Sequence, residues 1–156
     1  MELILDNRCG EALPTDDYLA LAGFVLTAES ASAAVELSIS LVDSDEMQAL
    51  NRQYRGIDSP TDVLSFENDG ELLGDVVICP KLAREHARDF DSSFANEMAL
   101  MLTHGILHLL GYDHIDDAEA AIMEARENQL LELWQQQAGP NPGANQKPDL
   151  ESGKQQ

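Results

Sequence analysis

The stretch Thr103–His114, THGILHLLGYDH, holds three of the four histidines in this chain of 156 residues. His104 and His108 are four residues apart. On a helix that spacing is about 400° of rotation and about 6 Å of rise, so both imidazoles project from one face. Gly111 comes three residues later, where the end of a helix favours a residue that tolerates positive φ. A sharp turn at Gly111 would bring His114 back toward the other two rings.

Three convergent imidazoles with an open fourth position are typical of a catalytic zinc site. The sequence therefore predicts one Zn²⁺ per chain, held by His104, His108 and His114 at the C-terminal end of a helix. The partial negative charge of that helix end also favours a cation. Asp113, which precedes His114, either orients a ligand imidazole or caps the turn.

Gly105 stands where zinc peptidases of the H-E-x-x-H type carry the glutamate that serves as general base. The ligands are kept and the base is missing, so the pattern disfavours peptide hydrolysis. A zinc ion still supplies hydroxide near neutral pH, which can attack a phosphodiester. Arg55 is the candidate partner for that chemistry, because a guanidinium binds two phosphate oxygens at once. The alternative for Arg55 is a surface ion pair with Asp58 or another nearby acid.

The composition indicates a single globular domain over residues 1–136, with 44% hydrophobic residues. Residues 137–156 are rich in proline, glycine, asparagine and glutamine, which predicts a disordered tail. No signal peptide and no long apolar stretch is visible, so we expect a cytoplasmic protein without a membrane segment. The net charge is -20, with 29 acidic and nine basic residues. Such a surface repels polyanions, so any contact with RNA needs a local basic site or a docking partner.

Four short strands and five helices, with most strands early in the chain, predict an α+β domain. Alternating and apolar runs favour strands at 1–6, 35–42, 62–66 and 72–80. Helical patterns cover about 15–30, 43–54, 81–90, 93–110 and 116–136.

The histidine block HGILHLLGYDH resembles the signature of the YbeY family of bacterial endoribonucleases. The blocks LNRQYRGIDSPTDVLSF (50–66) and LLGDVVIC (72–79) are similar to the family's other motifs, in the same order. The resemblance implies a small four-stranded mixed sheet flanked by helices. It also implies a zinc-dependent, single-strand-specific endoribonuclease that acts in 16S rRNA 3′ end maturation and ribosome quality control. The metal ligands then correspond to the three histidines and the functional arginine to Arg55, while Ser65 lies on the strand near the site and is a candidate for substrate contact.

Two alternatives remain beside this reading: a metzincin-like metallopeptidase and a non-catalytic, zinc-containing ribosome-assembly factor. For the endoribonuclease, the expected partners are the single-stranded 16S rRNA precursor and the ribosome. The net charge suggests that the acidic body docks on basic ribosomal proteins. Attack by water and attack by the RNA 2′-hydroxyl both fit one metal ion and one arginine.

A few further residues are expected to lie on the surface. Glu97 lies two turns before His104 and is expected to face solvent. His86 is expected on the surface as well. Lys81, Arg84 and Arg88 recur at helical spacing, which predicts a basic stripe that is either a solvated face or a contact for the RNA backbone.

Overall fold

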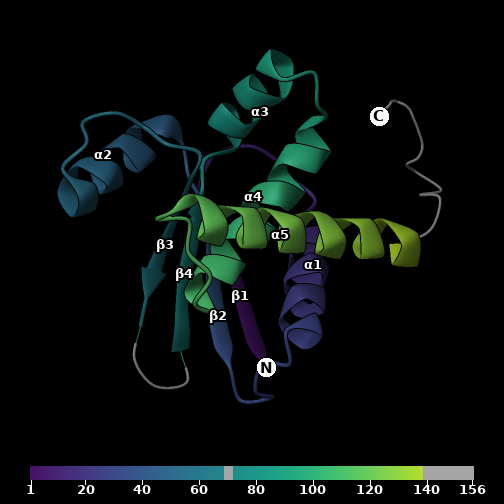
Figure 1. The fold of residues 1–156 in the computed structure, drawn as a ribbon. Helices are drawn as coiled ribbons and strands as arrows, with labels where there is room; N and C mark the ends of the chain where they lie inside the picture. The colour runs from purple at the N-terminus through teal and green to yellow at the C-terminus, as the bar shows by residue number, and fades with distance from the viewer. Residues whose placement is uncertain (69–71, 139–156) are drawn as a thin grey trace.

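A mixed sheet of four strands forms the base of the fold (Figure 1), in a computed structural model that describes residues 1–68 and 72–138. The strands are β1 (Glu2–Asn7), β2 (Glu36–Leu41), β3 (Val63–Glu67) and β4 (Leu72–Ile78), in the order β1-β2-β4-β3. β1, β2 and β4 run parallel, and β3 is antiparallel to β4. The predicted mixed sheet is therefore confirmed.

Five helices pack with this sheet, which confirms the predicted α+β class. They are α1 (Thr15–Ala28), α2 (Ser44–Arg55), α3 (Pro80–Asp89), α4 (Phe94–Leu109) and α5 (Asp117–Ala138). α2 begins where Asp43 caps it, since the Asp43 carboxylate accepts a hydrogen bond from the Glu46 N–H at 2.8 Å. The last helix reaches Ala138. The remainder of the predicted tail, 139–156, lies outside the described residues.

The alternation of side chains along the strands separates two layers. Leu37, Ile39 and Leu41 of β2 point to the main core, which α1 and α4 cover. On β4, Val76 belongs to this core, whereas Val77 packs on the opposite face against residues of and near α2. α5 lies across the outer side of α4, so α4 is enclosed between the sheet and α5 (Figure 1).

α4 is the central helix of the molecule, as expected for the histidine stretch. Buried side chains occupy nearly all of its sides, among them Met98, Leu102, Ile106 and Leu107. A helix that is apolar all round is one that other elements enclose. None of the helices in the described segments is both long enough and apolar enough to cross a membrane.

Gly105 is the point at which α4 comes closest to the sheet. A Cβ atom at this position would lie 2.7 Å from Cγ1 of Val76 and 3.1 Å from Oγ of Ser65. The Ser65 hydroxyl donates a hydrogen bond to the Gly105 carbonyl at 3.0 Å, which ties β3 directly to the helix. Glycine is therefore required here because the sheet occupies the space of a side chain.

The substitution Gly105→Ala should lower the free energy of unfolding by about 1–3 kcal/mol, the usual range for an added methyl group in a packed core. Val76 is branched and buried in β4, so it cannot move aside without disturbing the sheet. Urea denaturation of the wild type and the variant measures the difference.

The matched control is Gly23→Ala in α1. Its Cβ would meet Leu3 Cδ1 at 3.6 Å, an ordinary contact, so the gain in helix propensity of about 0.5–1 kcal/mol should stabilise the protein. A Gly105→Ala variant as stable as the wild type would contradict the close-packing argument.

Candidate metal centre

The three histidines of the signature stretch gather at the C-terminal end of α4. His104 and His108 lie on one face of the helix, as their spacing predicts. Gly111 adopts a φ of 108°, the left-handed region that was expected for the turn. The chain then returns, and the His114 ring centroid lies 5.4 Å from that of His104 and 5.9 Å from that of His108.

The rings face a pocket of about 410 Å³ between the end of α4, the end of α2 and β3. Arg55, the last residue of α2, lies in its wall. The lining residues other than Arg55 and the histidines come from β3 and the two residues before it: Thr61, Asp62, Val63, Leu64 and Ser65. The structure thus brings the three histidines, Arg55 and Ser65 to one cavity.

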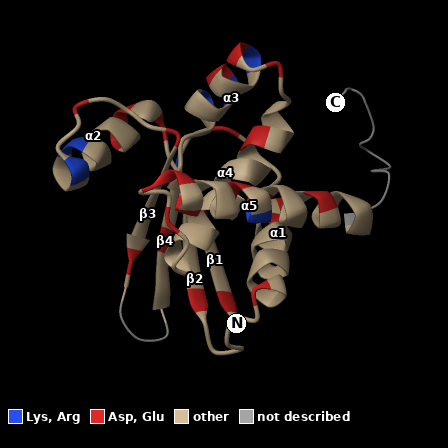
Figure 2. Cartoon of the chain, viewed as in Figure 1, with Lys and Arg blue, Asp and Glu red and all other residues tan. Residues whose placement is uncertain are grey.

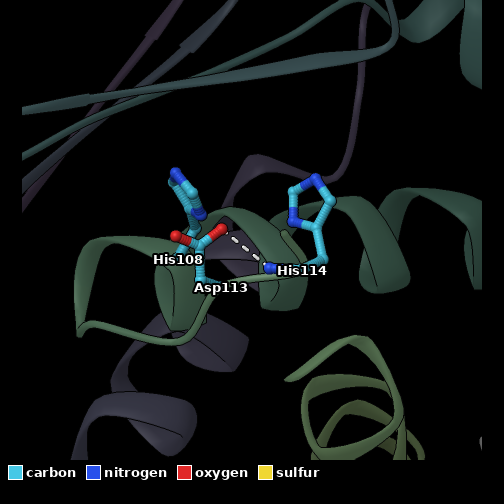
Figure 3. Close-up of side chains that lie close together, drawn as sticks. All are labelled: His108, Asp113 and His114. Carbon is cyan, nitrogen blue, oxygen red and sulfur yellow. Dashed lines mark hydrogen bonds between the residues drawn. The ribbon is translucent and has the colours of Figure 1, made fainter. Parts of the chain in front are cut away.

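Within the described residues, one group of side chains could hold a metal ion: His108, Asp113 and His114 (Figure 3). One ligand atom from each lies within 4.8 Å of the other two. His104 does not belong to this group, although its ring is close to His114. Within the described residues, the buried Nδ1 of His108 has no hydrogen-bond partner.

This donor set fits a transition-metal ion. Imidazole nitrogen together with a carboxylate oxygen suits zinc and its neighbours, whereas magnesium and calcium prefer oxygen ligands throughout. Zn–N bonds of about 2.0–2.1 Å place tetrahedral ligand atoms about 3.4 Å apart, so small side-chain movements would bring the donors into range. A metal site here is compatible with the positions of the side chains.

Asp113 caps the turn, which is one of the two roles considered for it from the sequence. Its Oδ1 accepts a hydrogen bond from the His114 backbone N–H at 2.7 Å (Figure 3). The same carboxylate lies beside the rings of His108 and His114. Its negative charge therefore favours a cation at this point, whether or not the carboxylate becomes a ligand.

The turn that carries Asp113 and His114 is anchored to two other helices. The Tyr112 hydroxyl donates to Glu29 Oε1 at 2.7 Å, and Arg126 Nε of α5 donates to Glu29 Oε2 at 2.6 Å. The hydrogen bond to the Glu29 carboxylate, together with burial, raises the pKa of Tyr112. The hydroxyl therefore remains a donor, and the turn is held against the C-terminal end of α1.

His104 has a partner that the sequence did not indicate. Its Nδ1 lies 2.5 Å from Oε2 of Glu127, a residue of α5 that is 7% exposed. Glu127 is one of several glutamates on an acidic helix, 23 residues from His104, and no local spacing singles it out. Only the packing of α5 on α4 brings the two side chains together.

Arg55 makes no ion pair within the part of the chain that the structure describes. Asp58, the partner considered as the alternative, instead contacts Arg52 at 3.4 Å and Gln48 at 3.1 Å. The guanidinium of Arg55 is therefore available to a ligand of the pocket.

The expectation that Glu97 faces solvent was wrong. Glu97 is 8% exposed, because α3 packs over this part of α4, and its carboxylate lies 3.3 Å from Nδ1 of His86. In the predicted basic stripe, Arg84 is half-exposed, forms an ion pair with Glu11 and lies 4.1 Å above the ring of Phe94.

Comparison with known proteins places the chain in a family. The family model described as endoribonuclease YbeY matches residues 7–135. An endoribonuclease YbeY of Chromohalobacter salexigens is 48% identical over 128 residues, covering 78% of this chain and 83% of its own. One of Alkaliphilus oremlandii is 42% identical over 144 residues, covering 84% and 95% respectively.

The fold agrees with this assignment. The solution structure of TM1509 from Thermotoga maritima superposes with a TM-score of 0.68 at 31% identity, and the match covers 96% of this chain and 99% of that one. The family match runs from before α1 into α5 and includes the three histidines and Arg55. This chain belongs to the endoribonuclease YbeY family.

Proposed function

We propose that this chain is a zinc-dependent endoribonuclease that cleaves single-stranded RNA in 16S rRNA 3′ end maturation and ribosome quality control. Membership of a family of endoribonucleases supports hydrolysis of RNA phosphodiester bonds. The observation that carries the metal-dependent mechanism is the pocket that three imidazoles and Arg55 line together.

His104, His108 and His114 would hold the ion, with the Asp113 carboxylate beside them. The ion would supply a Lewis acid for a phosphoryl oxygen and a source of hydroxide near neutral pH. Arg55, which lines the same pocket, binds the phosphate and stabilises the negative charge that develops on its oxygens. Glu127 and Glu29, the partners of His104 and Tyr112, keep the elements that carry the proposed ligands in place.

The peptidase alternative loses its remaining support from the position of Gly105. The general-base glutamate of such enzymes would have to stand at this position. In this fold the position faces Val76 and Ser65, with no space for even a Cβ atom. A carboxylate therefore cannot be introduced here without displacing the sheet.

The distribution of charged residues supports a proposal about the binding partners of this chain. Acidic residues are spread over the helices and strands, whereas basic residues form a few separate segments, mainly on α2, α3 and α5 (Figure 2). Arg55 is the Lys or Arg side chain that lines the metal pocket. The acidic body accordingly docks on basic ribosomal proteins in the cytoplasm, and a short piece of single-stranded rRNA enters the pocket.

Arg55→Ala should lower kcat/KM for a single-stranded RNA substrate by about 10–150-fold, since a hydrogen-bonded contact to a charged group contributes about 1.5–3 kcal/mol. Arg55→Lys should recover only part of this loss, because an ammonium cannot bind two phosphate oxygens in the same plane. The assay follows cleavage of a labelled oligoribonucleotide in the presence of zinc.

Arg52→Ala is the matched control. It removes the same charge one turn earlier on α2, from an exposed side chain whose one ion pair among the residues that the structure describes is with Asp58 at the surface. Equal loss of activity in the Arg52 and Arg55 variants would show that long-range charge, and not phosphate binding in the pocket, is responsible.

The docking proposal predicts a shallow salt dependence for naked RNA. With one arginine in the pocket, the slope of log K against log salt concentration should be no steeper than about -1 for single-stranded RNA. This slope is measured by fluorescence anisotropy of a labelled RNA oligomer, titrated with the full chain after a chelator has removed its metal. A slope of about -4 or steeper would indicate an extended RNA-binding surface and contradict docking through protein partners.

A further inference from the structure

Glu127 stands behind His104, on the side away from the metal pocket. Its carboxylate lines a separate cavity of about 180 Å³, to which His104 also contributes. Glu127 is not among the residues that line the 410 Å³ pocket. It therefore reaches the proposed site only through His104 and cannot contact a substrate bound in front of the ring.

The burial of Glu127 is not explained by stability alone. A carboxylate removed from water destabilises the fold unless hydrogen bonds compensate for the loss. Within the described residues the one hydrogen-bond partner of this carboxylate is His104 Nδ1, at 2.5 Å. A leucine or methionine could fill the same space without this cost. The carboxylate of Glu127 is therefore explained by its hydrogen bond with the His104 imidazole.

The hydrogen bond determines which nitrogen of His104 is free. A neutral imidazole carries one N–H and one lone pair, and an ionised carboxylate can only accept. The proton must then lie on Nδ1, which leaves the lone pair of Nε2 available to the metal pocket. Carboxylate partners of this kind fix the tautomer and the orientation of metal-ligating histidines.

We propose that Glu127 is a positioning residue, which holds the His104 ring in the orientation and tautomer that a divalent cation in the pocket requires. The proposal rests on the proposed metal-dependent function. α5 contributes a second, parallel restraint through Arg126, which holds Glu29 and thereby Tyr112 on the turn that leads to His114. The last helix, which provides no ligand itself, thus orients the ligands from behind.

The test is the zinc affinity of the full chain, measured by competition with a chromophoric chelator at fixed pH. Glu127→Gln keeps the shape of the side chain and removes its charge. It should raise the dissociation constant for zinc by about 10–100-fold, the range usual for such supporting partners. Glu127→Asp should weaken zinc binding to a similar degree, because the shortened side chain no longer reaches Nδ1 of His104.

Glu124→Gln is the matched control, since it removes the same charge from an exposed position one turn earlier on α5. Its zinc affinity should equal that of the wild type. Equal affinity for zinc in Glu127→Gln and Glu124→Gln would overturn the proposal. Failure of the wild type itself to bind zinc would instead overturn the proposed metal-dependent function.

A second measurement does not depend on whether the variants fold. Long-range ¹H–¹⁵N correlation spectra of the metal-free wild type report the tautomer of each histidine ring. The proposal predicts that neutral His104 carries its proton on Nδ1. Observation of the Nε2–H tautomer at His104 would contradict it.

Discussion

The contact of α4 with the sheet at Gly105 is the constraint on which the rest of the site depends. There is no space for a Cβ atom between the helix and Val76, and the Ser65 hydroxyl bonds the Gly105 carbonyl across the gap. Neighbouring residues on a helix are about 100° apart, so with Gly105 against the sheet, His104 is directed along the edge of β3 and toward the pocket. One turn later His108 faces the same way.

Side chains from the remaining helices complete this arrangement. Arg55, the last residue of α2, lines the same pocket as the three histidines. Glu127 holds His104 from α5, and Glu29 of the α1 end holds Tyr112 on the returning turn. Each segment that carries a proposed ligand is therefore fixed by a contact with a different helix, so that the histidine rings lie close together. Such preorganisation reduces the entropy lost when a ligand is ordered.

Local patterns were sufficient for the elements and for the gathering of the three histidines at the end of α4. The His104 and His108 spacing, the positive φ at Gly111 and the Asp43 cap each depend on a few neighbouring residues, and each is found as predicted. The sequence explains Gly105 only in part. It shows that a glutamate is absent, but not that Val76 fills the space a side chain would need at this position. Glu127 and Glu97 could not be predicted, because their partners His104 and His86 lie on other helices and are brought to them by tertiary packing.

The central claim is that His104, His108 and His114 together hold one divalent cation with an open coordination position. A crystal structure of the zinc-loaded protein tests it most directly. The account predicts one ion bonded to a nitrogen of each of the three rings at about 2.0–2.1 Å, Nε2 in the case of His104, with solvent at the fourth position. A structure in which the His104 ring points away from the ion, or in which the Asp113 carboxylate closes the fourth position, would contradict it.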